Sequence, residues 1–169
     1  MTWLDATAQA ELVRSGEASP RELTEAAIAR IEAVNPKLDA VIRTRFDAAL
    51  AEAEGRLPDG PFRGVPILLK DLGCLVAGEV TAFGLGPLKD VAWPVTSYLA
   101  GHFLAAGFIP LGRTNVPELG TTLTTEALSF PPAGRLEPHQ PALARRNADR
   151  ATAIAGVRDR HQAGRHRGG

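Results

Sequence analysis

The sequence is poor in cysteine, long apolar runs and targeting signals, and each shortage excludes a class of protein. Its single cysteine, Cys74, excludes an internal disulfide and is typical of a reducing cytosol. No apolar run approaches the roughly 20 residues that a membrane-spanning helix needs. The first residues lack the basic region and apolar stretch of a signal peptide. We therefore expect a cytoplasmic protein with no membrane partner.

The composition changes abruptly after Phe130. Charges balance over the whole chain, yet residues 131–169 hold 8 basic and 3 acidic side chains and contain no lysine, serine or aromatic residue. Large apolar residues are too few there to offset the roughly 1–2 kcal/mol of backbone entropy lost per ordered residue. We therefore expect one folded unit at residues 1–130, followed by an Arg-rich tail at 131–169 that is disordered or derives from a shifted reading frame.

Three helices are expected in the first third of the chain. The first runs from about Asp5 to Arg14, and the third covers Phe46 to Glu54. The second begins at the capping box Ser19-Pro20-Arg21-Glu22, and we expect it to end at Asn35-Pro36. Residues 38–44 fit either a short strand or part of a helix.

Two short apolar runs with a helix between them predict an α/β fold. Val65–Leu69 and Phe108–Leu111 have the composition of strands buried on both faces. The intervening helix is expected from Ser97 to Ala106, closed by Gly107. A strand, helix and strand in this order indicate a layered α/β arrangement.

Lys70 stands at the carboxyl end of the first of these strands, where we expect it to be partly removed from water. Desolvation disfavours the charged ammonium, and a neutral lysine can act as a general base. Asp71 does not automatically cancel this effect, because successive strand residues point to opposite faces. The competing interpretation is that Lys70 extends from the strand end into solvent.

Two segments give the chain a family resemblance. Phe62–Asp71 (FRGVPILLKD) resembles the Gly-x-Pro, apolar, Lys-Asp segment of the amidase-signature family, and Gly112–Gly120 (GRTNVPELG) resembles a second family stretch. At Arg113 the family more usually has lysine. The resemblance implies part of the amidase-signature fold, a mixed sheet covered by helices on both faces.

The same resemblance implies a hydrolase that cleaves non-peptide carboxamide bonds of small-molecule substrates. Catalysis would use a Ser-Ser-Lys triad in which Lys70 is the general base for a bridging serine that activates the nucleophilic serine. In the family both serines belong to a Gly/Ser-rich region beyond the segment matching residues 112–130. We expect no metal and no cofactor.

The serines of this chain do not supply that region. None of the four serines lies in a run of glycine and serine, and capping explains Ser15, Ser19 and Ser97. Ser129 has no glycine neighbour. We therefore expect a truncated amidase-family protein that is inactive by itself.

Other reactive side chains are weaker candidates. Cys74 lies close to Lys70 in sequence, but a lone cysteine in an apolar loop is typical of a small hydrophobe. His102 has no acidic or cysteine partner at a suggestive spacing. The tail histidines His139, His161 and His166 also lack metal-ligand spacing.

Two other functions compete with the amidase hypothesis. A lyase or aldolase could use Lys70 to form a Schiff base with a carbonyl substrate. A non-catalytic protein could instead use the arginines of residues 131–169 to neutralise nucleic-acid phosphates, although we expect no nucleic-acid partner.

Overall fold

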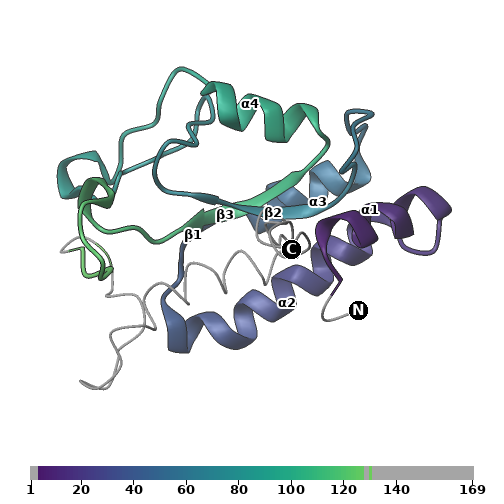
Figure 1. The fold of residues 1–169 in the computed structure, drawn as a ribbon, viewed down its shortest axis with the longest axis horizontal. Helices are drawn as coiled ribbons and strands as arrows, with labels where there is room; N and C mark the ends of the chain where they lie inside the picture. The colour runs from purple at the N-terminus through teal and green to yellow at the C-terminus, as the bar shows by residue number, and fades with distance from the viewer. Residues whose placement is uncertain (1–3, 128–129, 131–169) are drawn as a thin grey trace, which may run out of the picture.

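The computed structural model describes residues 4–127 and 130, and the predictions for residues 131–169 and for Ser129 lie outside this part of the chain. Within the described ranges no helix combines the length and apolarity that crossing a membrane requires. The elements, shown in Figure 1, are α1 (Ala6–Ser15), α2 (Pro20–Leu38), β1 (Val41–Thr44), α3 (Phe46–Glu54), β2 (Pro66–Lys70), the 3-10 turn η1 (Gly86–Leu88), α4 (Tyr98–Ala105), β3 (Ile109–Thr114) and the 3-10 turn η2 (Glu118–Gly120).

The three strands form one mixed sheet in the order β1-β3-β2. β2 runs parallel to β3, with Lys70 opposite Thr114 at the carboxyl ends, and α4 provides the crossover between the two strands. β1 runs antiparallel to β3 and places Thr44 opposite Gly112. The predicted strand, helix and strand unit is therefore confirmed, and residues 41–44 are strand rather than helix.

Helices cover both faces of the sheet, as expected. One apolar core joins α2 and α3 to the sheet through Ile31, Leu68 and Ile109. The other joins α1 and α4 to the opposite face through Leu69 and Phe108. Figure 1 shows α4 on one side of the strands and α2 on the other. Both strands predicted to be doubly buried are buried along their apolar runs.

The helix starts follow from local side-chain caps. The Asp5 carboxylate accepts a hydrogen bond from the Ala8 N–H at 2.8 Å, and α1 ends where Gly16 adopts a φ of 78°. Ser19 and Glu22 form the predicted capping box, with the Ser19 hydroxyl accepting from the Glu22 N–H at 3.1 Å and Glu22 Oε2 accepting from the Ser19 N–H at 2.7 Å. These caps satisfy N–H groups that a helix start leaves without partners.

The predicted end of the second helix is wrong, because α2 continues through Asn35 and Pro36 to Leu38. Proline removes one helical hydrogen bond. The last turn is nevertheless closed, since the Asp39 N–H donates to the Asn35 carbonyl at 2.8 Å. The Asn35 side chain also binds both backbone groups of Val41, at 2.9 and 2.8 Å, which fixes the start of β1. Asp39 then ends the helix with a φ of 46°.

Candidate active site

Lys70 is the last residue of β2 and is exposed to solvent. The four residues before it are buried, so the burial pattern changes at the strand end, and the expectation that Lys70 is partly removed from water is wrong. The physical reason is its position, since a side chain at a strand terminus can extend beyond the layers that cover the strand. Lys70 is paired in register with Thr114 of β3. It therefore stands at the shared carboxyl edge of the two parallel strands.

Asp71 is the buried counterpart of Lys70, with 0% of its surface exposed. Both carboxylate oxygens accept from the Ala82 N–H, at 3.1 and 3.2 Å. Its N–H donates to the Thr114 carbonyl at 3.2 Å, and its carbonyl accepts from the Phe83 N–H at 3.1 Å. Asp71 thus joins the end of β2 to both β3 and the 82–83 segment, which fixes the backbone next to Lys70.

Burial raises the pKa of the Asp71 carboxyl, while the hydrogen bonds from Ala82 and Gly84 and the charges of Arg113 and Arg43 lower it without cancelling the effect of burial. The folded protein therefore holds this proton more tightly than the unfolded chain. The resulting stabilisation is fully present below the unfolded pKa and is lost as the pH rises through the higher folded pKa.

We expect this loss to be specific to Asp71. As the pH rises from about 4 to 7, the protein should lose stability relative to its Asp71→Asn variant, as measured by urea denaturation across this range. Asp47→Asn, on an exposed position of α3, is the matched control. A difference between the protein and Asp71→Asn that stays constant with pH would contradict the prediction.

The described serines have local structural roles. The Ser97 hydroxyl accepts from the Ala100 N–H at 3.4 Å and donates to the Gly73 carbonyl at 3.0 Å, which caps α4. Ser19 caps α2, and the Ser15 hydroxyl donates to the Leu12 carbonyl at 3.2 Å. The structure therefore places each of these three serines at a helix end.

Cys74 is buried, with 6% of its surface exposed, and belongs to the core between the sheet and α4. Burial raises the pKa of its thiol, although the charge of Arg113 and a backbone hydrogen bond with Lys70 lower it.

Because a buried thiol with a raised pKa is a poor nucleophile, we expect native Cys74 to react at least about tenfold more slowly with a thiol reagent than Cys74 unfolded in urea. Equal labelling rates in the two states would contradict its burial.

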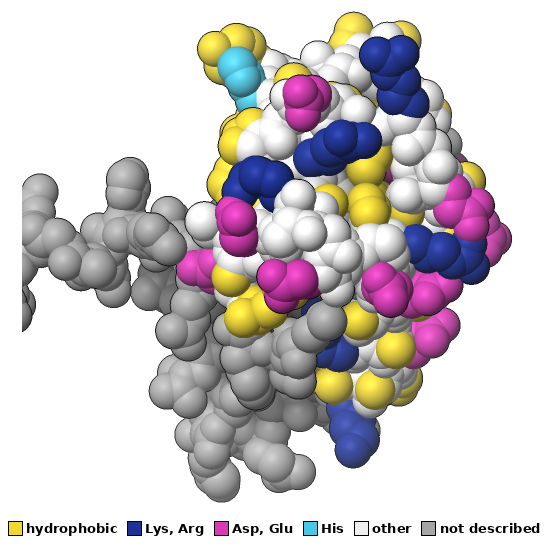
Figure 2. All heavy atoms as spheres, turned by 90° about the vertical axis from the view of Figure 1, so that its right-hand side faces the viewer, with side chains coloured by type: hydrophobic (Ala, Val, Ile, Leu, Met, Phe, Trp, Pro, Cys, Tyr) yellow, Lys and Arg dark blue, Asp and Glu magenta, His cyan; other side chains and the backbone are white. Residues whose placement is uncertain are grey.

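His102 is exposed on α4, and its ring lies 4.2 Å from that of Tyr98. Figure 2 shows the histidine at the surface in cyan. An exposed histidine whose ring contacts Tyr98 fits a surface role better than that of a base. No cluster of three potential metal ligands occurs among the described residues, and the tail histidines lie outside them.

An ion-pair network that the sequence did not predict links β3 to α3. Arg113 is 3% exposed and binds Glu79 at 3.0 Å; Glu79 also binds Arg45 at 2.9 Å, and Arg45 binds Glu52 at 2.5 Å. The Arg113 guanidinium also donates to the Cys74 carbonyl. The sequence feature that could have indicated this network is Arg113. The family more usually has lysine at this position, whereas the arginine side chain can bind two partners at once.

This network borders a cavity of about 560 Å³ lined by Ile42, Arg43, Thr44, Arg45, Ala48, Glu79, Val80, Gly112 and Arg113. Arg45 and Arg113 already have carboxylate partners, so their charges are neutralised within the protein. We therefore interpret the ion-pair network as a structural link that anchors residues 74–79 to the sheet.

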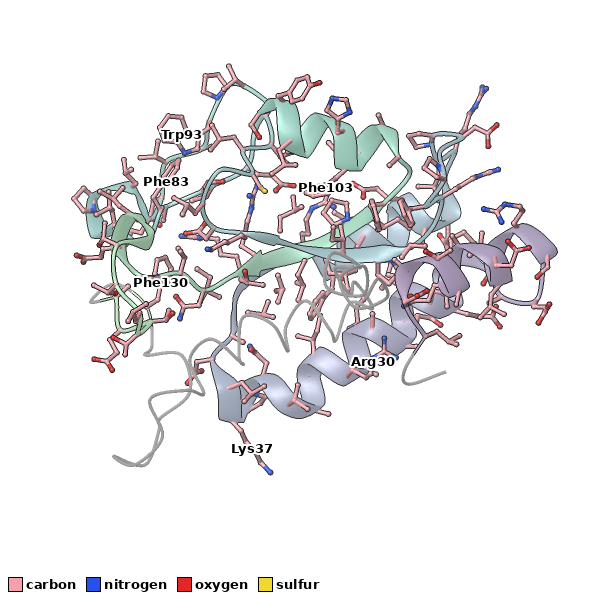
Figure 3. All side chains as sticks on the ribbon, in the orientation of Figure 1. Arg30, Lys37, Phe83, Trp93, Phe103 and Phe130 are labelled. Atoms are coloured by element: carbon pink, nitrogen blue, oxygen red, sulfur yellow. The ribbon has the colours of Figure 1, made fainter. Side chains whose placement is uncertain are left out.

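Two strained loops meet at the carboxyl edge of the sheet. Phe83 and Leu119 have positive φ values of 56° and 51°, which are uncommon for bulky residues. The Leu119 N–H donates a hydrogen bond to the Phe83 carbonyl at 2.8 Å, and this bond links the two strained residues directly. Phe83 also packs edge-on against Trp93, with ring centroids 5.7 Å apart (Figure 3). Such strain concentrates at functional sites, and it occurs here beside the strand end that carries Lys70.

Comparisons with known proteins identify the family of the chain. The family model described as Amidase matches residues 22–135. The 6-aminohexanoate-cyclic-dimer hydrolase of Pseudomonas sp. (strain NK87) is 48% identical over 126 residues, which are 73% of this chain and 25% of that protein. The acylamidase of Rhodococcus erythropolis is 39% identical over 127 residues, which are 70% of this chain and 26% of that protein.

A solved structure of 6-aminohexanoate cyclic dimer hydrolase complexed with substrate superposes with a TM-score of 0.72 and 46% identity, covering 78% of this chain and 27% of that one. A bacterial aryl acylamidase of the amidase signature family gives a TM-score of 0.66 at 32% identity, covering 74% of this chain and 28% of that one. The chain thus spans about a quarter of the length of these relatives. Sequence and fold together establish that the chain belongs to the amidase family of hydrolases, which act on amide bonds.

Proposed function

We propose that Lys70 is the general base of a Ser-Ser-Lys site for carboxamide hydrolysis, and that both serines come from outside the 169 residues. The observation that carries the proposal is the position of Lys70, at the carboxyl end of β2 within the segment that matches the family. Lys70 would take a proton from a bridging serine, and that serine would deprotonate the nucleophilic serine as it attacks the amide carbon. Water would then hydrolyse the resulting acyl-enzyme.

The substrate is proposed to be a small non-peptide amide. Support comes from the relatives, which include a 6-aminohexanoate-cyclic-dimer hydrolase and an acylamidase. The same matches support amide hydrolysis over Schiff-base lyase chemistry at Lys70 and over nucleic-acid binding by the tail. A cytoplasmic location belongs to the same proposal and is supported by the single, buried and unpaired cysteine.

A single-chain chimera that contains both serines would test the proposed role of Lys70. Residues 1–130 of this protein would replace the matching region of the 6-aminohexanoate-cyclic-dimer hydrolase, so that the rest of that enzyme supplies the serines. The chimera should hydrolyse the cyclic dimer or an acyl anilide, and borohydride should trap no carbonyl compound on Lys70. A chimera that folds but hydrolyses neither amide would count against the proposal, and a borohydride adduct at Lys70 would favour the lyase.

A further inference from the structure

The cavity of about 560 Å³ beside the ion-pair network combines a cluster of arginines with apolar surface. Its volume lies within the roughly 300–1,000 Å³ that is typical of sites for small organic molecules. Arg43, Arg45 and Arg113 contribute guanidinium groups to the lining. Other lining side chains are apolar or carry a hydroxyl group: Ile42, Ala48, Val80 and Thr44. Lys70 is not part of this lining, so the candidate base does not account for the cavity.

The arginines of the cavity outnumber the carboxylates that pair with them. Arg113 binds Glu79 at 3.0 Å. Arg45 binds the same Glu79 at 2.9 Å and also binds Glu52 at 2.5 Å. Arg43, in contrast, forms no ion pair with any residue that the structure describes. The cluster therefore retains one positive charge that no described carboxylate contacts.

Uncharged groups position the half-buried Arg43 guanidinium. Its Nη2 donates to the Lys89 carbonyl, and its Cζ lies 5.6 Å from the centre of the Phe130 ring. Its Nε is buried and has no hydrogen-bond partner among the described residues. A carbonyl and an aromatic ring attract a guanidinium without neutralising its charge. These contacts therefore orient Arg43 and leave its positive charge available to an anion.

Asp71 does not serve as the contact partner of Arg43. Burial raises the pKa of the Asp71 carboxyl, and the charge of Arg43 is among the smaller influences that lower it. Both oxygens of this carboxylate accept from the Ala82 N–H, at 3.1 and 3.2 Å. No ion pair joins Asp71 to Arg43 in the part of the chain that the structure describes. Arg43 thus acts on Asp71 through space and retains the capacity to bind an anion in the cavity.

We propose that this cavity binds a small aliphatic carboxylate. The carboxylate group would pair with Arg43, because the planar fork of guanidinium donors matches the two oxygens of a carboxylate. The hydrocarbon part would contact the apolar lining around Ile42 and Val80. A monoanion matches the single unpaired charge, whereas inorganic phosphate would leave the apolar lining uncovered. The inference is independent of the proposed role of Lys70.

The test is a titration of the isotope-labelled 169-residue chain with pentanoate, followed through the NMR signals of the backbone amides. We expect saturable shifts at residues 42–45 and 112–113, whose concentration dependence gives the Kd. Pentanamide has nearly the same shape as pentanoate but no charge, so it should bind at least about tenfold more weakly. A titration with inorganic phosphate at the same ionic strength measures the affinity for an anion without a hydrocarbon part.

Arg43→Gln should raise the Kd for pentanoate at least about tenfold, because it removes the unpaired charge. Ala48→Phe should also weaken binding, since it fills the cavity without altering a charge. The matched control is Arg56→Gln, which alters an exposed arginine outside the lining and should leave the Kd unchanged.

Circular dichroism verifies that each variant folds, and the comparison of pentanoate with pentanamide decides the matter on the unaltered chain. The inference would be overturned by the absence of saturable shifts, by shifts outside the cavity, by equal binding of pentanamide, or by an unchanged Kd in folded Arg43→Gln. Tighter binding of phosphate than of pentanoate would overturn the assignment of a carboxylate.

Discussion

Amide turnover by the purified 169-residue chain is expected to equal that of its Lys70→Met variant. The described serines lie at helix ends, and none of the chain's four serines lies in a glycine- and serine-rich run. Without a nucleophilic serine, Lys70 cannot promote formation of an acyl-enzyme. Loss of the nucleophile of a catalytic triad typically lowers the reaction rate by a factor of about 10⁴–10⁶. Lys70 is moreover exposed, so water surrounds the group that would have to accept a proton.

The assay would follow a panel of aryl and alkyl amides over long incubations, with Lys37→Met as the control for losing a lysine charge elsewhere. Hydrolysis by the chain that clearly exceeds that of Lys70→Met would show that these 169 residues contain a complete site. The assignment of both serines to another part of the domain would then be wrong.

Gly112→Ala is expected to have the largest effect on stability. Gly112 has a φ of 156°, and an added Cβ would overlap the Arg43 carbonyl of the neighbouring strand β1. Thr44 pairs with Gly112 across the same contact, so β1 would have to move away from β3. Overpacking combined with backbone strain should lower the free energy of unfolding by about 3 kcal/mol or more.

Gly101→Ala provides the matched control, because Gly101 lies in α4 and the nearest atom to an added Cβ is 3.9 Å away. That change should be neutral or stabilise the protein by up to about 1 kcal/mol, since alanine favours the helix. Urea denaturation of the two variants gives the comparison. Equal midpoints would mean that β1 does not pack as closely against β3 as the structure indicates.

Much of the fold is encoded in short-range signals. The bounds of α3, the capping box of α2 and the β2–α4–β3 unit follow from caps, glycines and apolar runs, and all agree with the structure. The exception is Pro36, where the rule that proline ends a helix does not hold. There the Asn35 side chain binds Val41, a contact between the helix and the following strand that no local pattern reveals.

The sequence predicted Lys70 as the candidate base but not the environment of its side chain. The family-like segment identified Lys70, yet its exposure depends on where the layers covering β2 end. The opposite orientation of Asp71 followed from strand alternation, whereas its bonds to Ala82 and Thr114 depend on loop closure. The network of Arg113, Glu79 and Arg45 joins residues far apart in sequence, so periodicity and spacing contained no signal for it.

The most direct test of the account is the effect of Lys70→Met on kcat in the single-chain chimera that supplies the serines. General-base catalysis typically contributes about 10²–10⁴ in rate, so the variant should lose at least about 100-fold in kcat while Lys37→Met keeps the activity of the parent chimera. Circular dichroism would verify that both variants fold. An active chimera whose kcat is unchanged by Lys70→Met would contradict the assignment of Lys70 as the base.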